Sequence, residues 1–184
     1  EDVAQVLNST PYRRRLSLVR ARVYEEMQGL TAQIKADMSR ILTEGLARGQ
    51  NPLTIASQLR LQTDLPLYRC KRIARTEITT ALRRARMDEA DEAEDSLGLM
   101  TRQMHISALS PTTRSSHAAR HAKIYTTDQQ RDWWSRDANS INCKCSTVTV
   151  LVDREGNVLN PGIVARAKEN YRVAAEKYKD EWSD

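Results

Sequence analysis

The chain has 184 residues, a net charge of +5, no Phe and 40% hydrophobic residues. This length predicts one domain with extensions, and the hydrophobic content is too high for wholesale disorder. No run of about 18 apolar residues occurs and the first residues lack a basic and an apolar region, so we expect neither a membrane span nor a signal peptide. Cys occurs three times, and this odd number argues against a disulfide framework.

The first part of the chain predicts helices, because apolar residues recur every three or four positions. The predicted helices cover 12–28, a stretch from Thr31 to between Gly45 and Gly49, 52–60, and a long stretch from Asp64 or Pro66 to about Asp95. Asn51 and Pro52 are an N-cap and a first helical residue for the third of these. Gly98 ends the long helix.

The second part alternates between strand and helix signals. Strands are predicted at 99–109 and 146–152, a short helix at 113–121, a second capped by Thr127-Asp128, a return strand at Val158-Leu159 and a terminal helix at 162–182. The predicted fold class is α+β, predominantly α-helical. It consists of a helical N-terminal arm (1–62), a small antiparallel β module with helices (63–160) and a C-terminal helix (161–184).

Four residues that bind metals lie close together in the sequence. His117 and His121 are four apart, which on a helix places both imidazoles on one face. Cys143 and Cys145 are two apart, so on an extended segment their thiols point the same way. Two His and two Cys form an acceptable tetrahedral set, so a zinc site is one interpretation of these four residues.

The alternative without a metal treats the two Cys as small buried hydrophobic residues and the two His as hydrogen-bonding groups across a turn. A disulfide between Cys143 and Cys145 is disfavoured by the very short loop it would close. Cys70 lies far away in the sequence, in a basic helix, and is expected to be a lone thiol.

A catalytic alternative uses the same region. A nuclease would draw on His105, His117, His121 and Arg114, and a Cys–His nucleophilic pair is also conceivable. Neither is required by the spacing, because no third group that would orient a base is evident. We therefore expect no catalytic residues and no enzyme.

Basic residues cluster on the long helix at Arg83, Arg84 and Arg86, which favours a nucleic-acid surface. The alternative is a solvated helix face with i,i+4 pairing, and the acidic residues from Asp88 to Asp95 follow at once.

Two further interpretations concern Trp133-Trp134: a core pair, or a platform on which bases stack.

Four motifs in a fixed order resemble the phage head morphogenesis family, minor head proteins similar to the F protein of phage Mu. They are Arg75-Thr76-Glu77 early in a long helix, Thr113-Arg114-Ser115-Ser116-His117, Lys123-Ile124-Tyr125 with the Trp segment, and Asn142-Cys143-Lys144-Cys145 before a valine-rich strand. The resemblance covers about Arg72 to Asp153. This sequence has Ala122 where the family commonly has glycine, and Lys144 where it has arginine.

The resemblance implies a structural protein of the virion, made in the host cytoplasm and present in several copies inside the capsid or at the portal vertex. Its expected partners are the portal or the major capsid protein, and packaged DNA, with no membrane. Its role would lie in head morphogenesis, DNA packaging or ejection. Residues 1–62 would dock, and Arg75, Thr76, Glu77 and Arg114 would organise the module. The alternative is a DNA-binding or nuclease or toxin-like module delivered with the phage genome.

Overall fold

The structure, a computed structural model, describes Arg13 and residues 30–184, so the predicted helix at 12–28 lies outside the described residues except for Arg13. Two compact units are present. The helical unit ends at Ala85 and includes residues 140–143, and the α+β unit comprises residues 86–139 and 144–184. Helices predominate beside one small antiparallel sheet, which confirms the predicted fold class. Among the described residues, no helix has the length and hydropathy needed to span a membrane.

The helical unit contains α3 (Ala32–Ala47), α4 (Pro52–Thr63) and the first part of α5 (Leu67–Leu97). Its core is almost entirely aliphatic. The buried residues include Met38, Ile41, Leu42, Ile55, Leu59, Ile73 and Ile78. These positions follow the helical spacing seen in the sequence, so the periodicity predicted the buried face correctly.

Capping residues set the boundaries of the helices. The Thr31 side chain accepts a hydrogen bond from the Ile34 N–H, and that of Asn51 accepts one from the Leu53 N–H. Helix α4 runs three residues beyond its predicted end and stops at Asp64, which has a φ of 54°. Asp is among the few residues that tolerate this left-handed conformation at a helix end.

Helices α3 and α4 pack closely at Gly45. A Cβ atom at this position would lie 2.5 Å from side-chain atoms of Ile55. The absence of a side chain therefore permits the close packing of this helix pair.

Helix α5 ends at Leu97, and Gly98 follows with a φ of 63°, as the sequence predicted. The Glu94 carboxylate then accepts hydrogen bonds from the N–H and hydroxyl of Thr101. These bonds fix the turn from the helix into the first strand.

The sheet has the order β2-β1-β3, with β1 at Thr101–Ile106, β2 at Ile124–Tyr125 and β3 at Ser146–Leu151. Strand β2 was not predicted, because two residues carry no detectable alternation. Both pairings are antiparallel, and the register places His105 opposite Thr147 and Met104 opposite Val148. One face of the sheet is consequently polar and the other apolar.

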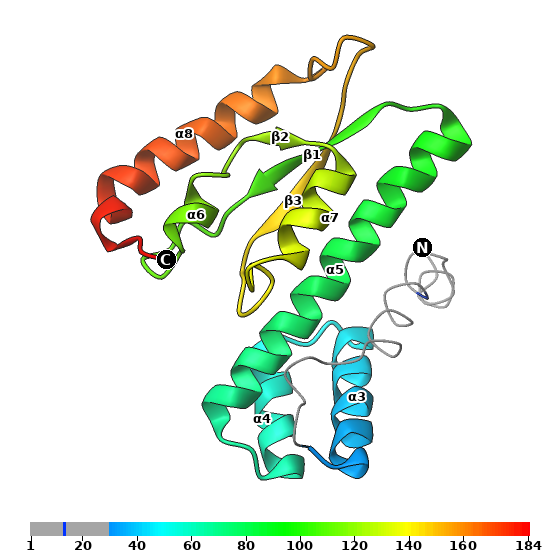
Figure 1. Cartoon of the computed structure of the whole chain (residues 1–184), viewed down its shortest axis with the longest axis vertical. Coiled ribbons are helices and arrows are strands. Elements are labelled where there is room, and N and C mark those ends of the chain that lie inside the picture. The colour runs from blue at the N-terminus through cyan, green and yellow to red at the C-terminus, as the bar shows by residue number, and fades with distance from the viewer. Residues whose placement is uncertain (1–12, 14–29) are drawn as a thin grey trace. The chain divides into compact units, whose positions relative to one another are not determined.

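Helix α8 (Pro161–Tyr178) covers the apolar face, where Met104 and Val150 pack with Ala167 (Figure 1). The short 3-10 turn η2 (Lys179–Glu181) follows. The predicted return strand is reduced to one bridge between Val152 and Val158.

Helix α7 (Thr127–Ser135) packs on the polar face through Gln130, whose side chain is hydrogen-bonded to His105. Its N-cap is Thr126, one residue before the predicted cap, and a capping box with Gln129 is complete. Arg131 forms ion pairs with Asp88 and Asp91 of α5 and so attaches α7 to that helix within the α+β unit.

Candidate metal centre

The loop after β1 carries the first ligand candidate. Helix α6 covers only Ser115–Ala118, so the predicted helix at 113–121 is shorter than expected. His121 lies beyond its end, in a turn. The expectation that His117 and His121 share one helix face is therefore wrong, because the helix stops after one turn.

His117 and Cys145 are in direct contact within the α+β unit. The His117 Nδ1 and Cys145 Sγ atoms are 3.5 Å apart. Both side chains are buried, with 2% and 4% of their surface exposed. A substrate cannot reach the sulfur without a rearrangement, which argues against the Cys–His nucleophilic pair.

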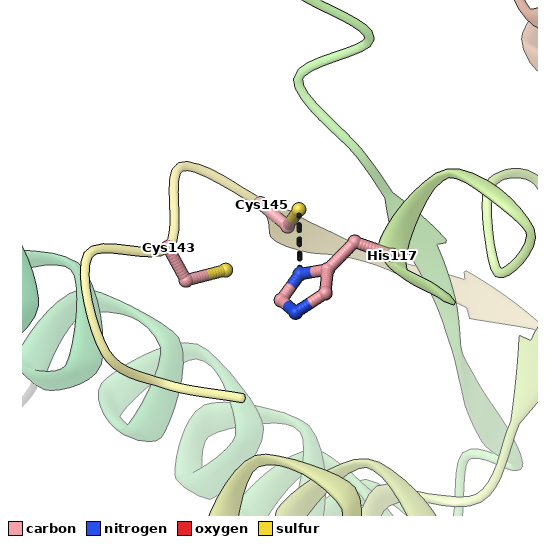
Figure 2. Close-up of side chains that lie close together, drawn as sticks. All are labelled: His117, Cys143 and Cys145. Carbon is pink, nitrogen blue, oxygen red and sulfur yellow. Dashed lines mark hydrogen bonds between the residues drawn. The ribbon is translucent and has the colours of Figure 1, made fainter. Parts of the chain in front are cut away.

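Cys143 brings a second thiol to the same place (Figure 2). One ligand atom each from His117, Cys143 and Cys145 lies within 4.8 Å of the other two. Only Lys144 separates the two cysteines, so the chain itself keeps their Cα atoms within about 7 Å. Three of the four predicted zinc ligands are thus brought together.

His121, the fourth predicted ligand, is engaged elsewhere. Its Nδ1 accepts a hydrogen bond of 3.0 Å from the Ser107 N–H, and its ring stacks on Tyr171 of α8 at 6.3 Å between centroids. Burial lowers the pKa of His121 below its usual value. The neutral ring therefore serves as an acceptor in the packing between the loop and α8.

Ser107 connects the two histidines, and sequence reasoning did not identify it. Its N–H binds the His121 ring, and its hydroxyl donates to the backbone carbonyl of His117. The only signal in the sequence is its place directly after β1, where a serine is ordinary. Its role follows from the path of the loop.

Aromatic rings close the site on the side of α7. The Trp133 ring meets the ring of His117 at 4.7 Å and that of His105 at 5.1 Å, both in edge-on geometry. The Arg120 guanidinium lies 4.4 Å above the Trp133 ring, and burial lowers the pKa of this arginine. Trp134 is buried in the core of the unit, whereas Trp133 is half-buried.

The segment that precedes Cys143 is held by α5, within the helical unit. Arg75 Nη1 donates to Asn142 Oδ1 at 2.7 Å, and the Asn142 N–H donates to the Thr76 hydroxyl at 2.8 Å. The Thr79 hydroxyl donates to the carbonyl of Cys143 at 3.1 Å. Two motifs that lie about 65 positions apart are thus joined by direct hydrogen bonds.

Glu77 is buried, whereas Arg75 is only half-buried and binds a neutral amide oxygen. Two residues apart on a helix, these side chains do not face each other. That Arg75 and Glu77 brace the module through buried charge-assisted hydrogen bonds stays a prediction.

Arg114 organises the loop after α7. Its guanidinium donates to the carbonyls of Ala138 and Asn139 at 3.2 and 3.1 Å. The Asn139 amide in turn donates to the carbonyl of Trp133 at 2.9 Å. The arginine therefore orders the chain that leads into the cysteine segment.

The three arginines predicted to bind nucleic acid do not form one exposed cluster. Arg83 is buried and donates to the Thr80 hydroxyl at 3.0 Å, whereas Arg84 and Arg86 are exposed. Arg86 also donates to the Ser146 hydroxyl at 3.1 Å and to the Thr147 carbonyl. A phosphate-binding role thus remains a prediction only for the exposed pair.

Comparison with known proteins bears on this arrangement. The model of the family described as phage Mu protein F like protein matches residues 36–148. These residues extend from within α3 to within β3 and include every motif described above. Neither the curated proteins nor the solved structures gave a match. The chain belongs to the phage Mu protein F like family, a structural family of phage heads.

Proposed function

We propose that this protein is a minor head protein that associates with the portal or the major capsid protein during assembly of the phage head. The observation that carries the proposal is the family match over residues 36–148, which covers more than half of the chain. Virion location and association with other head components follow from the family. The portal or capsid contact, and a part in DNA packaging or ejection, are the proposed refinements.

The hydrogen bonds made by the motif residues support a structural role. Arg75, Thr76 and Arg114 bind neighbouring segments of the same chain. Such bonds hold a loop in one conformation, and a scaffold that must present a constant surface to a partner benefits from this rigidity. A catalytic group would instead need contact with a substrate.

The turn between α4 and α5 is the surface that best fits a docking role. We call the exposed side chains that flank it the α4–α5 patch: Arg60, Leu61, Tyr68 and Lys71. Leu61 is 83% exposed and Tyr68 70% exposed. Exposed apolar and aromatic side chains accompanied by cations favour a partner with an apolar recess and an acidic rim.

Binding to head components tests this function. We would measure sedimentation of the purified chain with assembled portal, with capsid shells and with DNA from the phage that encodes it. The Leu61→Asp/Tyr68→Asp variant should bind the portal or the shells at least about tenfold more weakly, since burying each carboxylate opposes association. Leu159→Asp is the matched control, because Leu159 is 62% exposed and belongs to the α+β unit.

Retention on DNA at low salt without binding to portal or capsid would favour the DNA-binding alternative. Wild-type chain that binds none of the three would contradict the proposal. Equal binding by the double variant and the control would place the contact outside the α4–α5 patch and would refute its docking role.

A further inference from the structure

We propose that His117, Cys143 and Cys145 bind one thiophilic metal ion, of the Zn²⁺ class, through the His117 Nδ1 and the two Sγ atoms. This ligand set differs from the four residues predicted from the sequence, because His121 is not part of it. Three protein ligands leave one of four tetrahedral positions for water or another donor. The inference is independent of the partner proposed above.

The distances suit a tetrahedral ion. With Zn–S of about 2.3 Å and Zn–N of about 2.0–2.1 Å, tetrahedral angles separate S from N by about 3.6 Å and S from S by about 3.8 Å. His117 Nδ1 and Cys145 Sγ are 3.5 Å apart, and all three ligand atoms lie within 4.8 Å of one another. Small side-chain rotations are therefore enough to centre an ion.

The donor atoms decide the class of metal. Thiolates and an imidazole are soft or intermediate ligands, which favour Zn²⁺ or Cu⁺ over Mg²⁺ and Ca²⁺. Cys143, Cys145 and His117 are all buried. Two buried thiolates need a neutralising partner, which a bound cation supplies.

The surrounding bonds hold the ligands in advance. Ser107 donates to the backbone of His117, Thr79 donates to that of Cys143, and Arg86 binds the residues that follow Cys145. Ligands that are already ordered lose little conformational entropy on binding. The same bonds explain how a Cys-X-Cys segment keeps both thiols on one side.

His121 is not among the side chains whose ligand atoms lie within 4.8 Å of one another. Its Nδ1 accepts the Ser107 N–H, and the ring is stacked on Tyr171. Recruiting Nδ1 would leave the buried N–H of Ser107 without its acceptor, which is unfavourable. The His117 Nδ1, by contrast, already faces a sulfur.

Cobalt substitution tests the site on the full, tag-free chain. The protein is purified with reductant, stripped with a chelator and titrated with Co²⁺, and Zn²⁺ is then added in competition. We expect one ion per chain, a thiolate-to-cobalt absorption band and tetrahedral d–d bands, all removed by Zn²⁺. Cys145→Ser and His117→Ala should weaken Zn²⁺ binding by more than about 100-fold, since even outer-shell partners contribute 10–100-fold.

Matched controls separate a metal site from general disturbance. Cys70→Ser removes a buried thiol outside the group and His121→Asn removes the excluded imidazole, so both should keep the cobalt spectrum. Cys145→His retains a ligand and should bind Zn²⁺ with a weaker thiolate band, even where Cys145→Ser fails to fold. A wild-type protein without the thiolate band, or a band that survives Cys145→Ser, would overturn the proposal. A Cys143–Cys145 disulfide that persists under reductant would do so as well.

Discussion

The two units of the chain bury different kinds of side chain. The helical unit has a core of Leu, Ile, Met and Ala, and its buried polar residues are Thr43, Thr63, Thr76, Glu77, Thr80 and Arg83. The α+β unit buries a polar face of its sheet against α7. Its buried polar residues are Thr101, Gln103, His105, Ser107, Thr113, His117, His121, Thr127, Gln130, Asn139 and Thr147. All three histidines and all three tryptophans of the chain belong to this unit.

This difference shows two ways in which a chain without Phe makes a core. Aliphatic packing depends on volume and tolerates exchange among apolar residues. A buried polar network depends on the pairing of each donor with an acceptor, and it is destabilised when one partner is lost. The helical unit should therefore respond to changes in volume and the α+β unit to changes in polarity.

The largest expected effect is the loss of volume in the helical unit. Leu59 is fully buried in α4, and Leu59→Ala should lower the free energy of unfolding by about 2–5 kcal/mol. Leu61→Ala on the same helix is the control, with a change within about 0.5 kcal/mol, because Leu61 is exposed. Urea unfolding followed by far-ultraviolet circular dichroism measures both. Equal losses of unfolding free energy in the two variants would contradict the expected dependence of the helical unit on buried volume.

A loss of polarity should be costly at the sheet face that α7 covers in the α+β unit. Gln130 is fully buried, accepts a hydrogen bond of 2.7 Å from Arg120 and is bonded to His105. Gln130→Leu should lower the free energy of unfolding by about 1–3 kcal/mol. The loss should be larger if the charged Arg120 finds no other acceptor. Tryptophan fluorescence during urea unfolding reports this unit.

The control for this change is Thr43→Val in the helical unit. The Thr43 hydroxyl is buried and, within the described residues, has no hydrogen-bond partner. Replacing it with a methyl group should leave stability unchanged or raise it by up to about 1 kcal/mol. A Thr43→Val variant as unstable as Gln130→Leu would show that the two cores do not differ in this way.

The smallest expected effect is a pH dependence that originates in the α+β unit. Burial holds the pKa of His121 below its ordinary value of about 6.5, so the ring is neutral in the folded protein when the unfolded chain takes up a proton. Stability is thus fully present above pH 6.5 and falls as the pH drops below it. His121→Asn keeps an acceptor for Ser107 but does not titrate, so its stability should fall less between pH 7 and 5.5. An equal fall in unfolding free energy between pH 7 and 5.5 in the two proteins, measured by urea unfolding, would contradict this assignment.

Sequence reasoning succeeded where local rules decide the structure. Helix α3 begins at Thr31 and Asn51 caps α4, as predicted, and Gly98 ends α5 in the left-handed conformation. These signals act over three or four residues and need no information about the rest of the fold. Strand β2 was missed because its two residues owe their conformation to β1.

The candidate site was predictable in composition but not in geometry. The scarcity and clustering of His and Cys indicated the region in which His117, Cys143 and Cys145 lie together. The early end of α6, however, separated His121 from His117. The bonds made by Ser107 and Thr79 depend on how distant segments meet, which no local spacing encodes.

The position before Cys143 accepts few residue types, because the backbone and the side chain of Asn142 each meet a separate requirement. Its backbone φ is 52°, its side chain accepts from Arg75 and its N–H donates to Thr76. Glycine would satisfy the backbone but not Arg75, whereas a β-branched residue would satisfy neither. Among the replacements for Asn, aspartate meets both requirements, so a library randomised at this position should return Asn and Asp.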